Sequence, residues 1–122
     1  MNKPKRKYDL EERLIEFSLL TMNVSKSIVN TNSGKNLSNQ LVRSSSSPAL
    51  NYGEAQAAES RKDFIHKLRI VQKELRETKV CLSILLRAQL VKNESLGQKA
   101  KQECSELIAI ITSSVATTQK RL

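Results

Sequence analysis

Glycine, proline and aromatic residues are scarce in this 122-residue chain, and their scarcity limits the fold. Three glycines and two prolines are too few for a many-turned β fold and indicate long helices joined by few turns. Two Phe, two Tyr and no Trp leave the core to Leu, Ile and Val. No apolar run approaches the roughly 20 residues of a membrane span, and no signal-peptide core follows the basic N-terminus. We therefore expect a cytoplasmic, all-α protein.

Residues with reactive side chains are equally few. One His and two Cys cannot supply the four ligands of a zinc site without help from carboxylates. Cys81 and Cys104 fall in predicted helices, where we expect them to be small buried apolar residues. The sequence has no glycine-rich phosphate loop, nucleophile triad or metal-ligand cluster. We expect no enzymatic activity, no cofactor and no bound metal.

The segment 59–90 is expected to form the central helix of the fold. One apolar seam runs along it at steps of four and three, and no Gly or Pro interrupts it. Ser60 is placed to cap its N-terminus. A helix with one apolar side needs other helices to cover that side. The seam residues are Phe64, Leu68, Val71, Leu75, Thr78, Leu82 and Leu85.

The side of this helix opposite the seam is basic over its first half. Because the chain carries a net charge of +9, the basic strip indicates a polyanionic partner, and nucleic acid before membrane. Scarce aromatic residues argue against stacking on bases, so we expect contact with the phosphate backbone. A solvated charged face without a partner is the alternative. The candidate nucleic-acid-binding residues are Lys62, Arg69, Lys73 and Arg76, with His66 between them.

In the second half of the same helix the outward strip becomes apolar, at Val80 and Ile84. An exposed apolar patch calls for another helix or another subunit to cover it, so these two residues are the candidate oligomer interface. The alternative function is therefore that of a protein-interaction scaffold.

A first and a last helix are expected to flank the central one. The first covers residues 9–30, with Asp9 as its N-cap, and Asn32-Ser33-Gly34 ends it. The last begins at Asn93 or Glu94 and runs to Thr118. The apolar seam of the first helix is expected to be widened by Ile15, Leu19 and Met22.

The remaining helix begins near Lys35 and contains an unusual serine run before Pro48. Proline removes a hydrogen bond and crowds the preceding turn, so a kink or a brief break is expected there. We expect the serines to cap the kink, and the weaker alternative is that they hold a phosphate. The four helices predict an antiparallel up-down-up-down bundle over residues 9–121, and residues 1–8 form a flexible basic tail.

Four polar residues are expected to have structural roles. Glu74 and Glu77 flank the central seam, where half-buried carboxylates pair with a cation such as Arg43 or with the serine run. A catalytic carboxylate pair is the weaker interpretation, because no nucleophile or second base completes a site. The full structural set is Asn51, Glu54, Glu74 and Glu77.

Several blocks of the sequence together resemble one known family, the four-helix-bundle proteins named after the intervening sequences of bacterial 23S ribosomal RNA genes. The resemblance covers nearly the whole chain. It implies a left-handed bundle that assembles as a ring, typically a homopentamer. In a relative, the accessory protein of diversity-generating retroelements, a basic barrel binds nucleic acid and a reverse transcriptase. The blocks are Asp9-Leu10-Glu11-Glu12-Arg13 with Phe17, Leu41-Val42-Arg43 with the four serines, Asn51-Tyr52-Gly53-Glu54-Ala55, and Asp63-Phe64-Ile65-His66-Lys67-Leu68 with Lys73-Glu74 and Glu77-Thr78.

Overall fold

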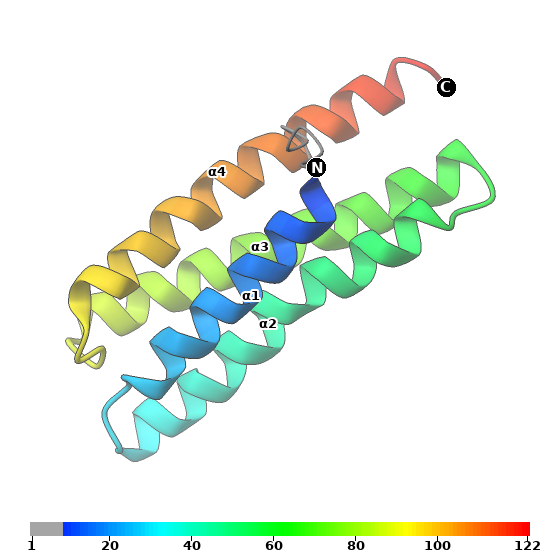
Figure 1. The fold of residues 1–122 in the computed structure, drawn as a ribbon. Coiled ribbons are helices and arrows are strands. Elements are labelled where there is room, and N and C mark those ends of the chain that lie inside the picture. Colours follow the sequence, from blue (N-terminus) through cyan, green and yellow to red (C-terminus); the bar gives the residue numbers. More distant parts are fainter. Residues whose placement is uncertain (1–8) are drawn as a thin grey trace, which may run out of the picture.

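The computed structural model describes residues 9–122, and these residues form four α-helices (Figure 1). The predicted all-α fold is confirmed, whereas the basic tail predicted at residues 1–8 lies outside the described residues. The helices are α1 (Leu10–Lys26), α2 (Asn32–Gln56), α3 (Arg61–Arg87) and α4 (Glu94–Gln119).

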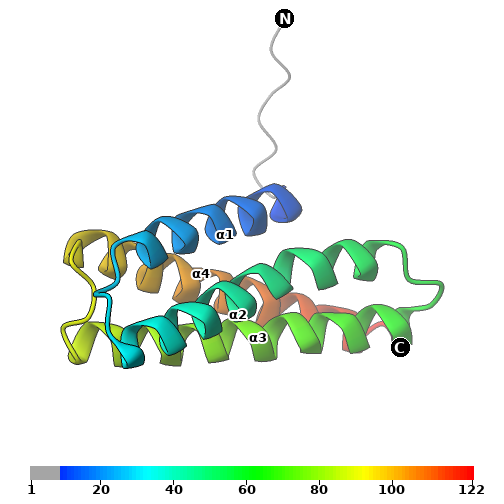
Figure 2. The ribbon, with the colours of Figure 1, turned by 90° about the horizontal axis from the view of Figure 1, so that it is seen from below.

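Consecutive helices run antiparallel, and each packs against its neighbours in the chain (Figure 1). Helix α1 also packs against α4, which closes the bundle, while α1 and α3 lie on a diagonal. Helix α1 has 17 residues, against 25 to 27 in the others. The α2–α3 turn and the end of α4 therefore project beyond α1 (Figure 2).

The core is built from aliphatic side chains, as the composition predicts. The α3 seam is buried from Leu68 to Leu85, and only Phe64 at its start is partly exposed. The expected widening of the α1 seam is wrong: Ile15, Leu19 and Met22 are 39%, 49% and 37% exposed. The core side of α1 is narrower than expected, since it comprises Leu14, Phe17, Ser18, Thr21 and Val24.

The connection between α1 and α2 differs from the expectation. Helix α1 ends at Lys26, and the predicted stop at Asn32 is instead the first turn of α2. The Thr31 side chain caps α2 by accepting a hydrogen bond from the Gly34 backbone N–H at 3.0 Å. Gly34 is required there, because an added Cβ would lie 2.1 Å from the backbone oxygen of Val29.

The α1–α2 connection is fixed by a short pairing with the α3–α4 connection. Val29 N–H donates to the Leu90 carbonyl at 2.8 Å, and Lys92 N–H donates to the Ser27 carbonyl at 2.8 Å. Helix α3 ends at Arg87, and Gln89, between the helix and this pairing, has a positive φ of 59°. These bonds outside the helices end α1 and α3 earlier than the periodicity alone predicts.

Helix α2 is continuous through the serine run and Pro48, so the predicted break does not occur. Ser44 Oγ lies 2.9 Å from Thr78 Oγ1 of α3, and Ser45 Oγ lies 2.6 Å from Thr21 Oγ1 of α1. The phosphate alternative is therefore wrong, because these two hydroxyls are buried and already bonded and no helix N-terminus is exposed beside them. The serines join α2 to both of its neighbours.

Candidate nucleic-acid interface

The four candidate cations lie on the outward face of α3, where all are exposed. Ser60 starts the helix as predicted, with its side chain accepting from Asp63 N–H at 3.1 Å. The helix carries eight Lys or Arg residues and only three Asp or Glu residues. Within the described part of the chain, no ion pair involves Lys62, Arg69, Lys73 or Arg76. These four positive charges are therefore open to a partner.

Other cations of the bundle are bonded to carboxylates, in contrast to the strip. Arg43 of α2 bonds Glu74 at 3.2 Å and also bonds Glu77, both on α3. The Glu77 hydrogen bond is the main reason that the pKa of Arg43 is raised. Arg43 is thus the partner of both carboxylates, although Glu74 is largely buried and Glu77 is exposed.

The other two predicted polar residues also bind locally. Lys67 Nζ lies 2.5 Å from Glu54 Oε1, which joins α3 to α2. Asn51 Nδ2 donates to the carbonyl and the hydroxyl of Ser47, one turn earlier, at 3.0 and 2.9 Å. These contacts lie within α2 or between α2 and α3, so they fix the helix that carries the basic strip.

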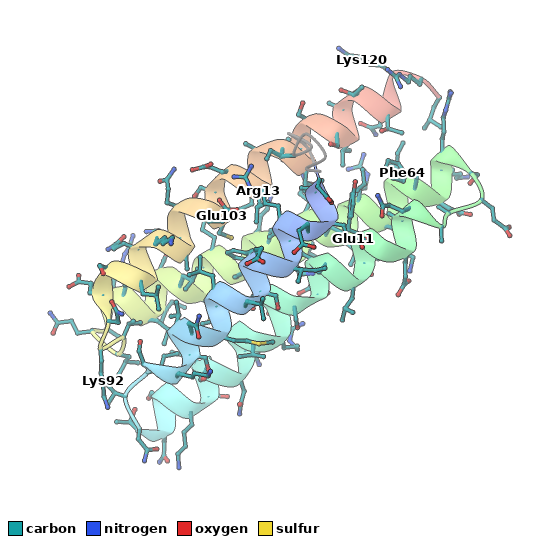
Figure 3. The ribbon with its side chains drawn as sticks, in the orientation of Figure 1. Glu11, Arg13, Phe64, Lys92, Glu103 and Lys120 are labelled. Atoms are coloured by element: carbon teal, nitrogen blue, oxygen red, sulfur yellow. The ribbon has the colours of Figure 1, made fainter. Side chains whose placement is uncertain are left out.

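The contact between α1 and α4 contains a further bidentate ion pair. Arg13 donates to both carboxylate oxygens of Glu103 at 2.8 and 2.9 Å and to Glu106 at 3.0 Å (Figure 3). Beside it is a groove of about 490 Å³ between the two helices, with Phe17 and Leu20 among its lining residues. Its lining has three carboxylates, Glu16, Glu103 and Glu106, against the one cation Lys99, so its charge is opposite to that of the α3 strip.

A family model described as the 23S rRNA-intervening sequence protein matches residues 6–113. The chain belongs to this family. Its fold is similar to that of a protein of unknown function from the S23 ribosomal protein family of Bacteroides thetaiotaomicron. That crystal structure has a TM-score of 0.78 and 31% sequence identity, covering 86% of this chain and 96% of the other. No curated protein matches the chain.

In this 23S rRNA-intervening sequence family member, the outward face of α3 becomes apolar beyond Arg76. Val80 and Ile84 are 59% and 46% exposed and stand one turn apart. Cys81 beside them is buried, and its thiol lies 3.5 Å from the Leu37 carbonyl of α2. Burial raises the pKa of Cys81 to about 11, so this thiol is protonated and unreactive near neutral pH.

A second exposed apolar patch, on α1, was not identified from the sequence of this family member. Ile15, Leu19 and Met22 follow each other at steps of four and three, on a side different from the core residues Leu14 and Phe17. The sequence does contain a signal for this patch. The core residues and the patch residues of α1 form two separate strips with helical spacing, and two such strips predict two separate apolar sides. We name Ile15, Leu19 and Met22 the α1 patch, and Val80 and Ile84 the α3 patch.

Two classes of site are absent from the described part of this family member. Among residues 9–122, no three His, Cys, Asp or Glu side chains gather in a group that could hold a metal ion. None of the four helices combines the length and the apolar character that spanning a membrane requires.

Proposed function

We propose that this protein is a non-enzymatic, oligomeric bundle that binds the phosphate backbone of nucleic acid through the outward face of α3. The supporting observation is the presence of four exposed cations without carboxylate partners on one helix face, while Arg13, Arg43 and Lys67 are paired. RNA is the proposed ligand, and the cytoplasm is the proposed location.

The spacing of the strip suits a charged backbone. Lys62 and Arg76 are 14 residues apart, which is about 21 Å along a helix. Successive phosphates on one strand are much closer than that, so the four cations reach several phosphates at once. No Phe, Tyr or Trp lies on this face of α3, since Phe64 belongs to the seam on the opposite side, so the contact carries little sequence preference.

Self-association would multiply this effect. The α3 patch supports assembly, because an exposed apolar surface is stabilised when a second subunit covers it. The resemblance favours a homopentamer. Repeating a basic strip around a ring raises the local concentration of binding sites for a long polyanion.

A second candidate function is that of an accessory subunit or scaffold for a nucleic-acid enzyme such as a reverse transcriptase. The exposed α3 patch favours it, because the same surface suits a different protein as well as a second copy. In that case the stable partner is a protein, and RNA is bound weakly or not at all.

The test compares two charge-reversal variants in RNA binding. In the first, Lys62, Arg69, Lys73 and Arg76 are changed to Glu; in the second, the control, the exposed residues Lys26, Lys35, Lys92 and Lys99 are changed to Glu. Both variants have the same net charge. We expect the first variant to lose RNA binding, with the slope of log affinity against log salt flattened by about 3, and the control to keep most of that slope.

Two outcomes would contradict the proposal. Equal losses in both variants would mean that net charge, and not the α3 strip, attracts RNA. Unchanged RNA binding in the variant with the four α3 substitutions would mean that this face of α3 does not bind RNA. Co-purification of a stable protein partner without RNA would favour the accessory-subunit function.

A further inference from the structure

The two exposed apolar patches lie on helices that are diagonal in the bundle, so they cannot cover each other within one chain. We propose that the α1 patch of one copy packs on the α3 patch of a second copy, in a head-to-tail contact. This inference rests on the self-association in the proposed function and specifies its two contacting surfaces.

The two patches adjoin in level along the bundle, and they meet where Met22 of α1 faces the start of the α3 patch. The bonds from Thr21 to Ser45 and from Ser44 to Thr78 place Thr21 of α1 level with Thr78 of α3. Helices α1 and α3 run parallel, since each is antiparallel to α2. Met22 is therefore level with the residue before Val80, whereas Leu19 is level with Arg76, about one turn, roughly 6 Å, from Val80. A rotation about an axis parallel to the helices would bring Met22 of one copy beside Val80 of the next, and a tilt of the neighbouring copy would extend the contact to Leu19.

The charges beside the two patches are opposite. Glu16 adjoins the α1 patch, and Arg76 adjoins the α3 patch. Neither side chain forms an ion pair within residues 9–122. The same two hydroxyl hydrogen bonds place Glu16 of α1 level with the turn of α3 from Lys73 to Arg76. Over whole helices the asymmetry persists, because α1 has three acidic and two basic residues whereas α3 has three acidic and eight basic residues.

The outward face of α3 thus divides between two partners. Val80, Ile84 and the adjoining Arg76 contact the next copy. In the assembled protein the proposed nucleic-acid set is therefore reduced from four cations to Lys62, Arg69 and Lys73, and Arg76 is free for phosphate only where the α3 patch is uncovered. A head-to-tail contact uses different surfaces on the two copies, so every added copy still presents one free patch. Growth stops only when the last copy meets the first, so this contact predicts a closed ring without any isologous contact.

Two variants that each remove one patch test the inference directly. Leu19→Asp breaks the α1 patch and Val80→Asp breaks the α3 patch, while Leu50→Asp changes an exposed leucine outside both patches, as the control. In light scattering without nucleic acid, we expect the wild type and the control to be oligomers. Each patch variant alone should be a monomer, with an unchanged helical circular dichroism spectrum.

Mixing the two patch variants gives the decisive result. Each retains the patch that the other lacks, so an equimolar mixture should form a heterodimer and nothing larger. An isologous α3–α3 contact predicts instead that Leu19→Asp remains an oligomer and that the mixture shows no heterodimer. That result, or a monomeric wild type, would overturn the inference.

A charge exchange gives an independent readout. Glu16→Arg and Arg76→Glu should each weaken assembly at low salt, and the double variant should recover it. Failure of the double variant to recover, when both single variants are weakened, would contradict the pairing. Assembly is measured here without RNA, so an oligomer that obeys these rules but binds no RNA refutes only the nucleic-acid part of the proposed function.

Discussion

Helices α1 and α3 bury a similar share of their residues but expose opposite surfaces. Five of the 17 residues of α1 and eight of the 27 residues of α3 are buried, which is about three in ten for each. Outside the core, α1 presents carboxylates and its apolar patch, whereas α3 presents cations and its own patch. The core therefore explains why both helices are folded, and only their outward faces distinguish what they bind.

The largest expected loss of stability comes from shortening a buried leucine side chain on either helix. Leu14 of α1 and Leu75 of α3 are both fully buried, so Leu14→Ala and Leu75→Ala should each lower the free energy of unfolding by about 2 to 5 kcal/mol. Urea denaturation followed by circular dichroism measures both variants. If Leu14→Ala costs far less than Leu75→Ala, then α1 is only loosely attached and the similarity of the two cores is wrong.

Leu19→Ala is the matched control on the surface of α1. Its side chain is 49% exposed, so at protein concentrations low enough to keep the subunit monomeric the variant should change its stability by about 0.5 kcal/mol or less. A larger loss that grows with protein concentration would show that Leu19 contributes through a second copy, and not through the core of its own chain.

The next effect in size concerns the buried hydroxyl bonds that tie α1 and α3 to the serines of α2. Thr21→Val and Thr78→Val each leave a buried serine hydroxyl without its threonine partner, at a cost of about 1 to 2 kcal/mol. The double variant Thr78→Val/Ser44→Ala should cost less than the sum of its two single variants, because the bond between the two hydroxyls is lost only once. Additive costs in this cycle would show that the two hydroxyls do not interact.

The sequence predicts most of the fold because the local signals are strong. Ser60 caps α3 and α4 begins at Glu94, both as expected, and the period of the α3 seam identifies its buried side. The errors occur where contacts distant in sequence decide. Gly34 reads as a helix stop, yet the Thr31 cap and the pairing with the α3–α4 connection make it part of α2. Pro48 predicts a kink or a brief break, yet the break is absent and Pro48 is buried inside a continuous helix.

The candidate site was predictable only in part, for a related reason. Helical spacing places Lys62 and Arg76 on one side of α3 without knowledge of any neighbour. Whether Ile15 and Leu19 are buried or exposed depends on how much of the α1 surface the neighbouring helices cover. The periodicity of the sequence does not give the extent of this coverage. An apolar strip can widen a core or form a surface, and only the positions of α2 and α4 separate the two.

The smallest expected effect comes from the ionisation of a buried thiol. Helix α1 has no buried titratable side chain among its described residues, so this effect belongs to the part of the bundle around α3. Cys104 is fully buried, with its thiol 3.1 Å from the Leu75 carbonyl of α3, and burial raises its pKa from 9.0 to about 12. As the pH rises, the thiol of the unfolded chain ionises before that of the folded protein. The thiol therefore does not affect the free energy of unfolding well below pH 9, and it lowers this free energy as the pH rises toward 12. The loss is about 1 kcal/mol between pH 9 and 10. Cys104→Ser keeps a donor for the Leu75 carbonyl but does not titrate, so its urea midpoint should fall less steeply over this interval than that of the wild type. A wild-type slope retained in Cys104→Ser would assign the alkaline loss to other groups, and Cys81→Ser, the α3 counterpart, provides the comparison.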